Sequence, residues 1–216
     1  MQQSKVGVIG LGVVGNAIRH GMLKLGHEVK FHDIALNTNI KDVIDTQLVF
    51  ICVPTNNVEG LNDSSQVELV IRELNAYNYR GVAVIKSTVV PGTTDRFIKE
   101  YPDLSIAFSP EFLRERYAEV DFIENMDILP IGTSNMEAFI RIRYFHGHYP
   151  KQVIQMTPKE AEYLKYFCNT FNALRIVFAN SFAAVCERDQ VNYQNIKNAA
   201  ILRSNIPDAY LDVNNT

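Results

Sequence analysis

The feature that most constrains this chain is a glycine-rich turn near its amino terminus, Gly10-Leu11-Gly12-Val13-Val14-Gly15. A short apolar run, Val6–Ile9, comes before the turn, and a helical pattern of apolar residues follows it. A G-x-G-x-x-G sequence between a buried strand and a helix is typical of a turn that binds the pyrophosphate of a dinucleotide. Gly10 allows the tight turn, Gly12 lets the backbone approach the phosphates, and Gly15 lets the helix pack closely on the strand. The free N–H groups at the start of the helix then face the phosphates.

A second predicted strand ends in an acidic residue. Residues 26–33 are expected to form a helix stop and a second strand that ends in Asp33, which lies 18 residues after Gly15. A carboxylate at this place accepts hydrogen bonds from the adenosine ribose in dinucleotide-binding folds. No arginine occurs in the seven residues after Asp33 to balance a 2′-phosphate. We therefore predict NAD as the cofactor, rather than NADP; the alternative is a glycine turn and a surface aspartate without a ligand.

Strands and helices alternate along the first 156 residues. After Asp33 comes a short polar segment with at most one or two helical turns, and apolar runs then recur with helical patterns between them. This alternation predicts an α/β fold with a doubly wound parallel sheet of the Rossmann type, which we assign to residues 1–156. The expected strands lie at residues 47–54, 81–85, 105–108, 127–131 and 152–155, and the expected helices lie after residues 64 and 94 and at 136–145.

A long helix is predicted after residue 156. The sequence Thr157-Pro158-Lys159-Glu160 places Thr at the N-cap, Pro at the first helical position and Glu at the third, which is a capping box. The helix could run to about Asp189, which at ~1.5 Å per residue is a length of ~48 Å. A short helix follows at residues 193–202. Residues 157–216 are therefore expected to be a long connecting helix and the start of a second, partial helical domain. We expect this second domain to be the central, dimerising domain of the protein.

The predicted long helix is too apolar around its circumference to be a lone exposed helix. We expect a homodimer that forms through it, because one face carries a row of large apolar residues: Phe171, Leu174, Phe178 and Phe182. The alternative is that a further carboxyl-terminal domain covers one face of the helix.

Composition excludes several classes of function. The formal net charge is −3 and the basic residues are scattered, so no binding surface for nucleic acid is predicted. No apolar run approaches the roughly 20 residues that a membrane span needs, and the first strand begins too early to leave room for a signal peptide. The three cysteines, Cys52, Cys168 and Cys186, lie in apolar stretches without a Cys-x-x-Cys pair. We expect them to be reduced, buried and structural, which favours a cytoplasmic location, and we expect no metal site.

Three polar groups are candidates for chemistry. The hydroxyls of Lys86-Ser87-Thr88 follow a predicted strand and could bind a ligand or cap the next turn. Glu111 and Glu115 are spaced i, i+4, so they share a face if the segment is helical; the alternative is a solvated acidic surface. Lys165 and Asn169 have the same spacing on the long helix, where the lysine could hold an oxyanion and the amide could orient a water or a hydroxyl. The alternative for that pair is a snorkelling lysine and a surface amide.

These motifs, in this order, resemble those of the UDP-glucose/GDP-mannose dehydrogenase family over nearly the whole chain. The resembling stretches are the glycine turn at 10–15, Cys52-Val53-Pro54-Thr55, Lys86-Ser87-Thr88-Val89-Val90-Pro91-Gly92-Thr93-Thr94, Ser109-Pro110-Glu111-Phe112-Leu113-Arg114-Glu115 and Glu162-Tyr163-Leu164-Lys165-Tyr166-Phe167-Cys168-Asn169-Thr170.

The resemblance implies an enzyme that oxidises the C6 alcohol of a nucleotide sugar, UDP-glucose above all, in two hydride transfers to NAD. It implies a long helix that links the domains and carries the dimer contact. It implies catalytic roles for Thr88, Glu111, Lys165 and Asn169. It implies substrate contacts by Glu111, Phe112, Leu113, Lys165 and Asn169. It implies cofactor contacts by Gly10, Gly12, Val13, Val14, Gly15, Asp33, Val53, Thr55, Thr88 and Glu115.

The chain departs from the family in two places. The segment between Asp33 and Leu48 is shorter than the family's, which abbreviates the adenosine end of the site. The family's nucleophilic cysteine lies in a Gly-Gly-x-Cys-x-x-Lys-Asp stretch, which these 216 residues do not contain, and the carboxyl-terminal UDP-binding domain is absent as well. We therefore expect a fragment or an incomplete enzyme.

Two other functions compete with this interpretation. A β-hydroxyacid dehydrogenase also combines an amino-terminal G-x-G-x-x-G with a Lys-x-x-x-Asn on a long helix, although the Lys-Ser-Thr and Pro-Glu-Phe-Leu-Arg-Glu stretches argue against it. The missing cysteine supports a non-catalytic module for NAD binding or dimerisation.

Overall fold

The structure, a computed structural model, describes residues 4–213. The chain divides into two compact units, Met1–Lys165 and Tyr166–Thr216, and helix α6 (Pro158–Arg188) contributes to both.

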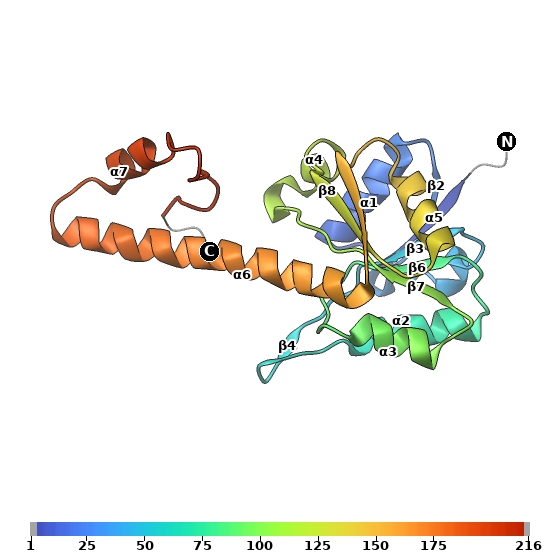
Figure 1. Cartoon of the computed structure of the whole chain (residues 1–216). Coiled ribbons are helices and arrows are strands. Elements are labelled where there is room, and N and C mark those ends of the chain that lie inside the picture. The colour runs from blue at the N-terminus through green and yellow to red at the C-terminus, as the bar shows by residue number, and fades with distance from the viewer. Residues whose placement is uncertain (1–3, 214–216) are drawn as a thin grey trace. The chain divides into compact units, whose positions relative to one another are not determined.

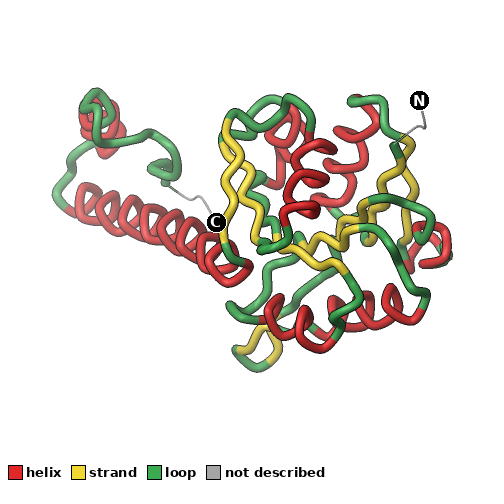
Figure 2. The backbone as a smooth tube through the Cα atoms, turned by 45° about the vertical axis from the view of Figure 1, so that its right-hand side comes forward, coloured by secondary structure: helices red, strands yellow, loops and turns green. Residues whose placement is uncertain are grey.

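A seven-stranded sheet forms the centre of the first unit, with the strand order β2-β1-β3-β6-β7-β8-β9 (Figures 1 and 2). The first five strands in this order are parallel to one another, and β8 is parallel to β9. The doubly wound sheet that the sequence predicted is confirmed in these strands. The strands are β1 (Lys5–Ile9), β2 (Glu28–His32), β3 (Leu48–Ile51), β6 (Val82–Ile85), β7 (Ser105–Phe108), β8 (Ile128–Gly132) and β9 (Gln152–Met156).

Two features differ from a purely parallel sheet. Strand β8 runs antiparallel to β7, and the two pair through Phe108 and Gly132. A small hairpin, β4 (Asn57–Val58) and β5 (Leu61–Asn62), follows β3, in a segment where the sequence predicted no strand.

Helices cover both faces of the sheet. In Figure 1, α1 and α5 lie on one side of the central strands, and α2 and α3 lie on the other. The helices of this unit are α1 (Val13–Lys24), α2 (Ser65–Ala76), α3 (Thr93–Glu100), α4 (Ala118–Ile123), α5 (Met136–His146) and the 3₁₀ turns η1 (Ile34–Leu36), η2 (Ile40–Val43) and η3 (Glu115–Tyr117).

A hydrophobic core lies on each face of the sheet. Phe50 and Val84 pack with α1, α4 and α5, whereas their strand neighbours Val49 and Ile85 pack with α2 and α3. Strands β3 and β6 are therefore buried on both faces, as central parallel strands are, which explains their continuous apolar sequences.

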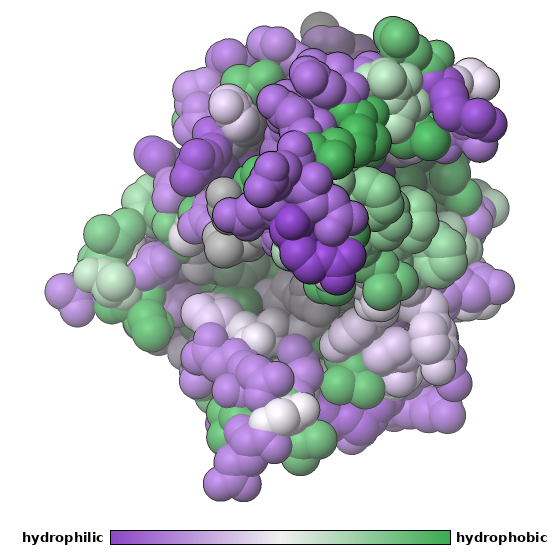
Figure 3. All heavy atoms as spheres, turned by 90° about the vertical axis from the view of Figure 1, so that its left-hand side faces the viewer, coloured by the Kyte–Doolittle hydropathy of each residue, from purple (hydrophilic) through white to green (hydrophobic). Residues whose placement is uncertain are grey.

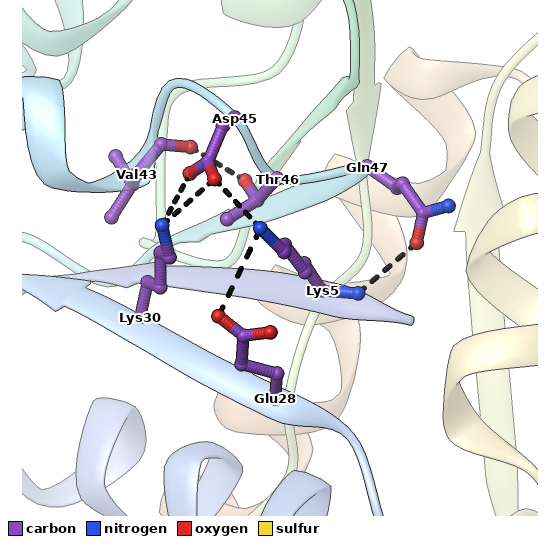
Figure 4. A network of polar contacts seen from close by, with 7 residues as sticks. All are labelled: Lys5, Glu28, Lys30, Val43, Asp45, Thr46 and Gln47. Carbon is purple, nitrogen blue, oxygen red and sulfur yellow. Dashed lines mark hydrogen bonds and ion pairs between the residues drawn. The ribbon is translucent and has the colours of Figure 1, made fainter. Parts of the chain in front are cut away.

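A network of exposed charges joins the starts of β1 and β2 at the amino-terminal edge of the sheet. Figure 4 shows Lys5 and Lys30 both pointing toward Asp45, with Nζ–carboxylate distances of 2.9 and 2.7 Å. Lys5 also lies 4.0 Å from a carboxylate oxygen of Glu28. The two lysines lower the pKa of Asp45 from 3.8 to about 2. This network lies at the opposite edge of the sheet from the glycine turn.

Helix α6 begins as the sequence predicts. The N–H of Thr157 donates to Glu160 Oε2 at 2.8 Å, and the N–H of Glu160 donates to Thr157 Oγ1 at 3.3 Å, so the capping box is present. The helix ends one residue before the expected Asp189. Among residues 4–213, no helix is both long and apolar enough to cross a membrane.

The second unit consists of the rest of α6, the helix α7 (Tyr193–Ala200) and a terminal loop. Lys197 fastens the loop to α7 through ion pairs with Asp208, at 2.8 Å, and Asp212.

The expected burial of the cysteines is only partly correct, because Cys186 is buried whereas Cys168 and, in the first unit, Cys52 are only partly buried. Hydrophobic residues, green in Figure 3, form patches on the face of the molecule that it presents.

Candidate functional site

The glycine turn brings β1 close to the start of α1. Gly10 has φ +87°, and a Cβ at Gly15 would lie 1.8 Å from the carbonyl oxygen of Gly10. Both positions therefore require glycine, as the sequence predicts. Gly12 is different, because a Cβ there would meet no described atom within 4 Å. Gly12 is the N-cap of α1 and provides no side-chain cap for the first N–H groups of the helix. The turn is therefore an open cradle of N–H donors, which fits a pyrophosphate.

Asp33 lies beside this cradle, at the end of β2. Its Oδ2 accepts a hydrogen bond from the Leu11 N–H at 2.6 Å, and its Oδ1 accepts one from the Ala35 N–H at 2.8 Å. A carboxylate has about four lone-pair sites, so these two bonds leave acceptor capacity for a ribose hydroxyl. The contact with the ribose stays a prediction, and the structure adds that Asp33 fixes the glycine turn.

The loop after β6 is tied to the neighbouring strand. Ser87 Oγ donates to the carbonyl oxygen of Val53 at 2.6 Å, which joins the carboxyl ends of β6 and β3. The carbonyl oxygen of Thr88 accepts a hydrogen bond from Asn62 Nδ2 at 3.2 Å. Thr55 and Thr88 are partly buried at this edge of the sheet. The Ser87 hydroxyl thus binds backbone, and the predicted cofactor contacts of Val53, Thr55 and Thr88 stay predictions.

A buried ion pair joins the segment after β7 to α6. Lys165 Nζ lies 2.8 Å from Glu111 Oε1 and donates to the Glu111 carbonyl oxygen at 2.6 Å. Only 7% of the Lys165 side chain and 16% of the Glu111 side chain are exposed. Glu111 Oε2 accepts the N–H of Leu113 at 2.7 Å, and Lys165 Nζ lies 5.5 Å from the centre of the Phe112 ring. Lys165 is therefore a paired, buried cation and not a snorkelling surface lysine.

The two glutamates at the carboxyl end of β7 do not share a helical face. The segment from residue 109 to 114 is irregular, and only Glu115 enters the short turn η3. Glu111 faces Lys165, whereas Glu115 is exposed. The condition for a shared acidic face is therefore not met, because the backbone does not form the helix that the i, i+4 spacing requires.

Two residues near this pair have roles that the sequence analysis did not find. The Arg114 side chain makes hydrogen bonds of 2.7 and 2.9 Å to Asp121, which lower the pKa of Asp121 to about 2 and hold the end of the 109–114 segment against α4. Lys86 is almost fully buried, and its Nζ lies 3.4 Å from both Ser109 Oγ and the Pro110 carbonyl oxygen. Burial lowers the pKa of Lys86 to about 8. An apolar strand that ends in lysine was the available signal for Lys86.

Asn169 lies one helical turn after Lys165 on α6, in the second unit, and is exposed. Its predicted part in the site stays a prediction.

The parallel sheet, the open glycine turn and the acidic residue at the end of β2 define a dinucleotide-binding domain. The chain belongs to the UDP-glucose/GDP-mannose dehydrogenase family. Residues 33–148 match the NAD-binding domain of that family, and residues 159–214 match its central domain. The family predicted from the sequence motifs is thereby confirmed.

Individual relatives agree with this assignment. The chain is 31% identical over 221 residues to a UDP-glucose 6-dehydrogenase of Rhizobium meliloti, an alignment that covers 91% of this chain and 50% of the relative. It is 29% identical over 165 residues to a GDP-mannose 6-dehydrogenase of Pseudomonas aeruginosa, which covers 68% of this chain and 37% of that protein. The chain thus spans half or less of the length of these two relatives.

A solved structure of a UDP-glucose dehydrogenase from the archaeon Pyrobaculum islandicum superposes with a TM-score of 0.89 at 28% identity. The superposition covers 98% of this chain and 60% of the archaeal one.

Proposed function

We propose that this chain is the NAD-binding and central part of a nucleotide-sugar dehydrogenase that acts on UDP-glucose. The observation that carries the proposal is the buried Glu111–Lys165 pair. It lies at the carboxyl end of the parallel strands, the edge of the sheet that also carries the open glycine turn. Ligands of such sheets bind at this edge. Family membership and the names of the relatives support the choice of substrate.

NAD would lie along the carboxyl ends of the central strands. The N–H groups of Val13, Val14 and Gly15 at the start of α1 would bind the pyrophosphate, and Asp33 would bind the adenosine ribose. Val53, Thr55, Thr88 and Glu115 would contact the rest of the cofactor. The bound nicotinamide would accept a hydride from the sugar C6.

Glu111 and Lys165 would act on the sugar. A lysine ammonium has three N–H donors, and two of those of Lys165 are used by Glu111 among the described residues. The third would stabilise negative charge on the C6 oxygen as the proton of that hydroxyl passes to a neighbouring water. Asn169 and Thr88 would orient a water or hydroxyl, and the backbone near Phe112 and Leu113 would contact the nucleotide sugar. The Arg114–Asp121 ion pair holds that backbone in place.

None of the cysteines has the properties of a catalytic nucleophile. A cysteine attacks as the thiolate, and burial raises the pKa of Cys52 to about 12. Cys168 and Cys186 lie within α6. We therefore propose that these 216 residues bind NAD without completing the oxidation to UDP-glucuronate, because covalent capture of the aldehyde gives access to the second hydride transfer.

The exposed apolar residues of α6 support a homodimer. Phe171, Leu174 and Phe178 are 51%, 62% and 60% exposed, although such side chains are normally covered. We propose that a second copy of this chain covers them.

The substrate class can be tested by thermal unfolding. With NAD present, UDP-glucose is expected to raise the melting temperature, whereas a small β-hydroxyacid at the same concentration leaves it unchanged. A larger shift with the hydroxyacid would favour the β-hydroxyacid dehydrogenase alternative and contradict the proposal.

Turnover can be tested by measuring NADH and separating the sugar products by chromatography. The purified chain is expected to form no UDP-glucuronate from UDP-glucose and NAD. Two NADH per sugar, with UDP-glucuronate as the product, would refute the proposal that oxidation stays incomplete. NAD-linked turnover of any sugar nucleotide would count against a purely non-catalytic module.

A further inference from the structure

The first two turns of α6 contact two loops at the carboxyl end of the sheet. Lys165 binds Glu111 in the segment after β7. Glu162, one turn earlier on the same helix, binds the loop that follows β6 and leads into α3. Residues three apart on a helix lie on the same side. One side of α6 therefore fastens both loops to which the proposed function assigns site residues.

The carboxylate of Glu162 is fully buried and faces the start of α3. Its two oxygens accept the N–H groups of Gly92 and Thr94 at 2.5 and 2.8 Å. Gly92 has φ +98°, a left-handed conformation that favours glycine, at the N-cap of α3. The first N–H groups of a helix have no partner within the helix and carry partial positive charge, so they bind a carboxylate well. Burial raises the pKa of Glu162, and these hydrogen bonds oppose the shift.

This arrangement is an unusual way to cap a helix. A side chain at the N-cap itself normally does so, but the N-cap of α3 is Gly92, which has no side chain that could accept these N–H groups. The carboxylate comes instead from α6, about 70 residues away in the sequence. A local Ser or Asp would cap α3 without the desolvation cost of a buried carboxylate. The distant cap has a consequence that a local one lacks: it fixes α6 against the loop after β6.

We propose that Glu162 is a positioning residue, which sets α6 on the loop after β6 so that Lys165 meets Glu111. The importance of Lys165 for chemistry rests on the proposed function, but its placement by Glu162 does not. Glu162→Gln is nearly isosteric and removes the negative charge. It also turns an NH₂ group toward backbone N–H groups, so at least one of the two hydrogen bonds is lost.

The test is site-specific lysine labelling of the full chain, measured by mass spectrometry with a limiting amine reagent. Glu162→Gln is expected to raise the labelling rate of Lys165 by about tenfold, because loss of a charge-assisted hydrogen bond favours local opening. Glu160→Gln is the matched control, since the Glu160 carboxylate also accepts a backbone N–H in the first turn of α6, but its hydrogen bonds among residues 4–213 go to Thr157 alone. It is expected to leave Lys165 within about twofold of its original rate. Lys197, equally buried in the second unit, is the internal standard.

Three outcomes would overturn the proposal: unchanged labelling of Lys165 in Glu162→Gln, an equal rise in Glu160→Gln, or a parallel rise at Lys197. If Glu162→Gln does not fold, Glu162→Asp replaces it, because aspartate keeps the charge and is one methylene short. It is then expected to give a smaller rise confined to Lys165, and no rise would equally overturn the proposal. The labelling rate of Lys165 does not depend on NAD binding or turnover. Failure of this proposal can therefore be distinguished from failure of the proposed function.

Discussion

At the scale of single residues, Asp45 controls the exposed charge network at the amino-terminal edge of the sheet. Its carboxylate binds Lys5 and Lys30, and its pKa falls from 3.8 to about 2. A carboxylate with a lowered pKa in the folded state stabilises the fold above its unfolded pKa. That contribution is lost as the pH falls through the folded pKa. The network should therefore be fully effective above about pH 4 and lost near pH 2.

Asp45→Asn is expected to lower the free energy of unfolding at neutral pH by at most about 1 kcal/mol, because solvent screens these exposed groups. Urea unfolding as a function of pH measures the difference in the free energy of unfolding between the original chain and Asp45→Asn. This difference should vanish as the pH falls from about 4 to about 2. Asp103→Asn is the control, since Asp103 is exposed and has no ion pair among residues 4–213. A difference that persists at pH 2 would show that Asp45 acts through something other than its charge.

Individual residues also show where sequence analysis stops. Gly10, Gly15 and the Thr157–Glu160 cap could be predicted because their roles depend on neighbours within a few positions. The contact between Lys165 and Glu111 spans 54 positions, and that between Glu162 and Gly92 spans 70. Glu111 and Glu115 would share a face only in a helix, and the spacing alone could not show that the backbone there is irregular. Only the folded chain shows which polar groups meet.

At the scale of elements, β1, the glycine turn and α1 form a unit in which two glycines have separate roles. Gly15→Ala places a methyl group 1.8 Å from the Gly10 carbonyl oxygen, so we expect a loss of about 3 kcal/mol or more in the free energy of unfolding. Gly12→Ala meets no described atom and should change stability by less than about 1 kcal/mol. It should still weaken NAD binding at least about tenfold, because its methyl group would occupy space that the pyrophosphate needs.

Urea unfolding and calorimetric titration with NAD measure the two effects separately. If Gly12→Ala bound NAD as tightly as the original chain, the open cradle would not be the phosphate site. If Gly15→Ala were as stable as the original chain, the close packing of α1 on the turn would not require glycine.

The strands and helices of the first unit were mostly predictable, because a central parallel strand is a continuous apolar run and each surface helix has an apolar face. The direction of β8 could not be predicted, because an apolar run has the same pattern in a parallel and in an antiparallel strand. The β4–β5 hairpin was missed as well, because its strands of two residues are too short to show alternation.

At the scale of the whole molecule, the exposed apolar face of α6 leads to a prediction about assembly. Light scattering at roughly tens of micromolar should detect a homodimer, as expected for an obligate interface. Phe178→Glu should shift the equilibrium toward monomer, because it places a charge in the proposed interface. Leu23→Glu is the control, since Leu23 is a similarly exposed apolar residue on α1. A monodisperse monomer of the original chain would refute the dimer.

The central claim is that the glycine turn and Asp33 form an NAD site, and calorimetric titration with NAD and NADP tests it most directly. The carboxylate of Asp33 lies beside the turn, so the 2′-phosphate of NADP would be repelled by its negative charge. This repulsion would weaken binding by on the order of several kcal/mol. We expect NAD to bind and NADP to bind at least about tenfold more weakly. Asp33→Asn, which removes the charge, should reduce the difference in affinity between NAD and NADP. Comparable dissociation constants for NAD and NADP with the original chain, or no binding of NAD, would contradict the account.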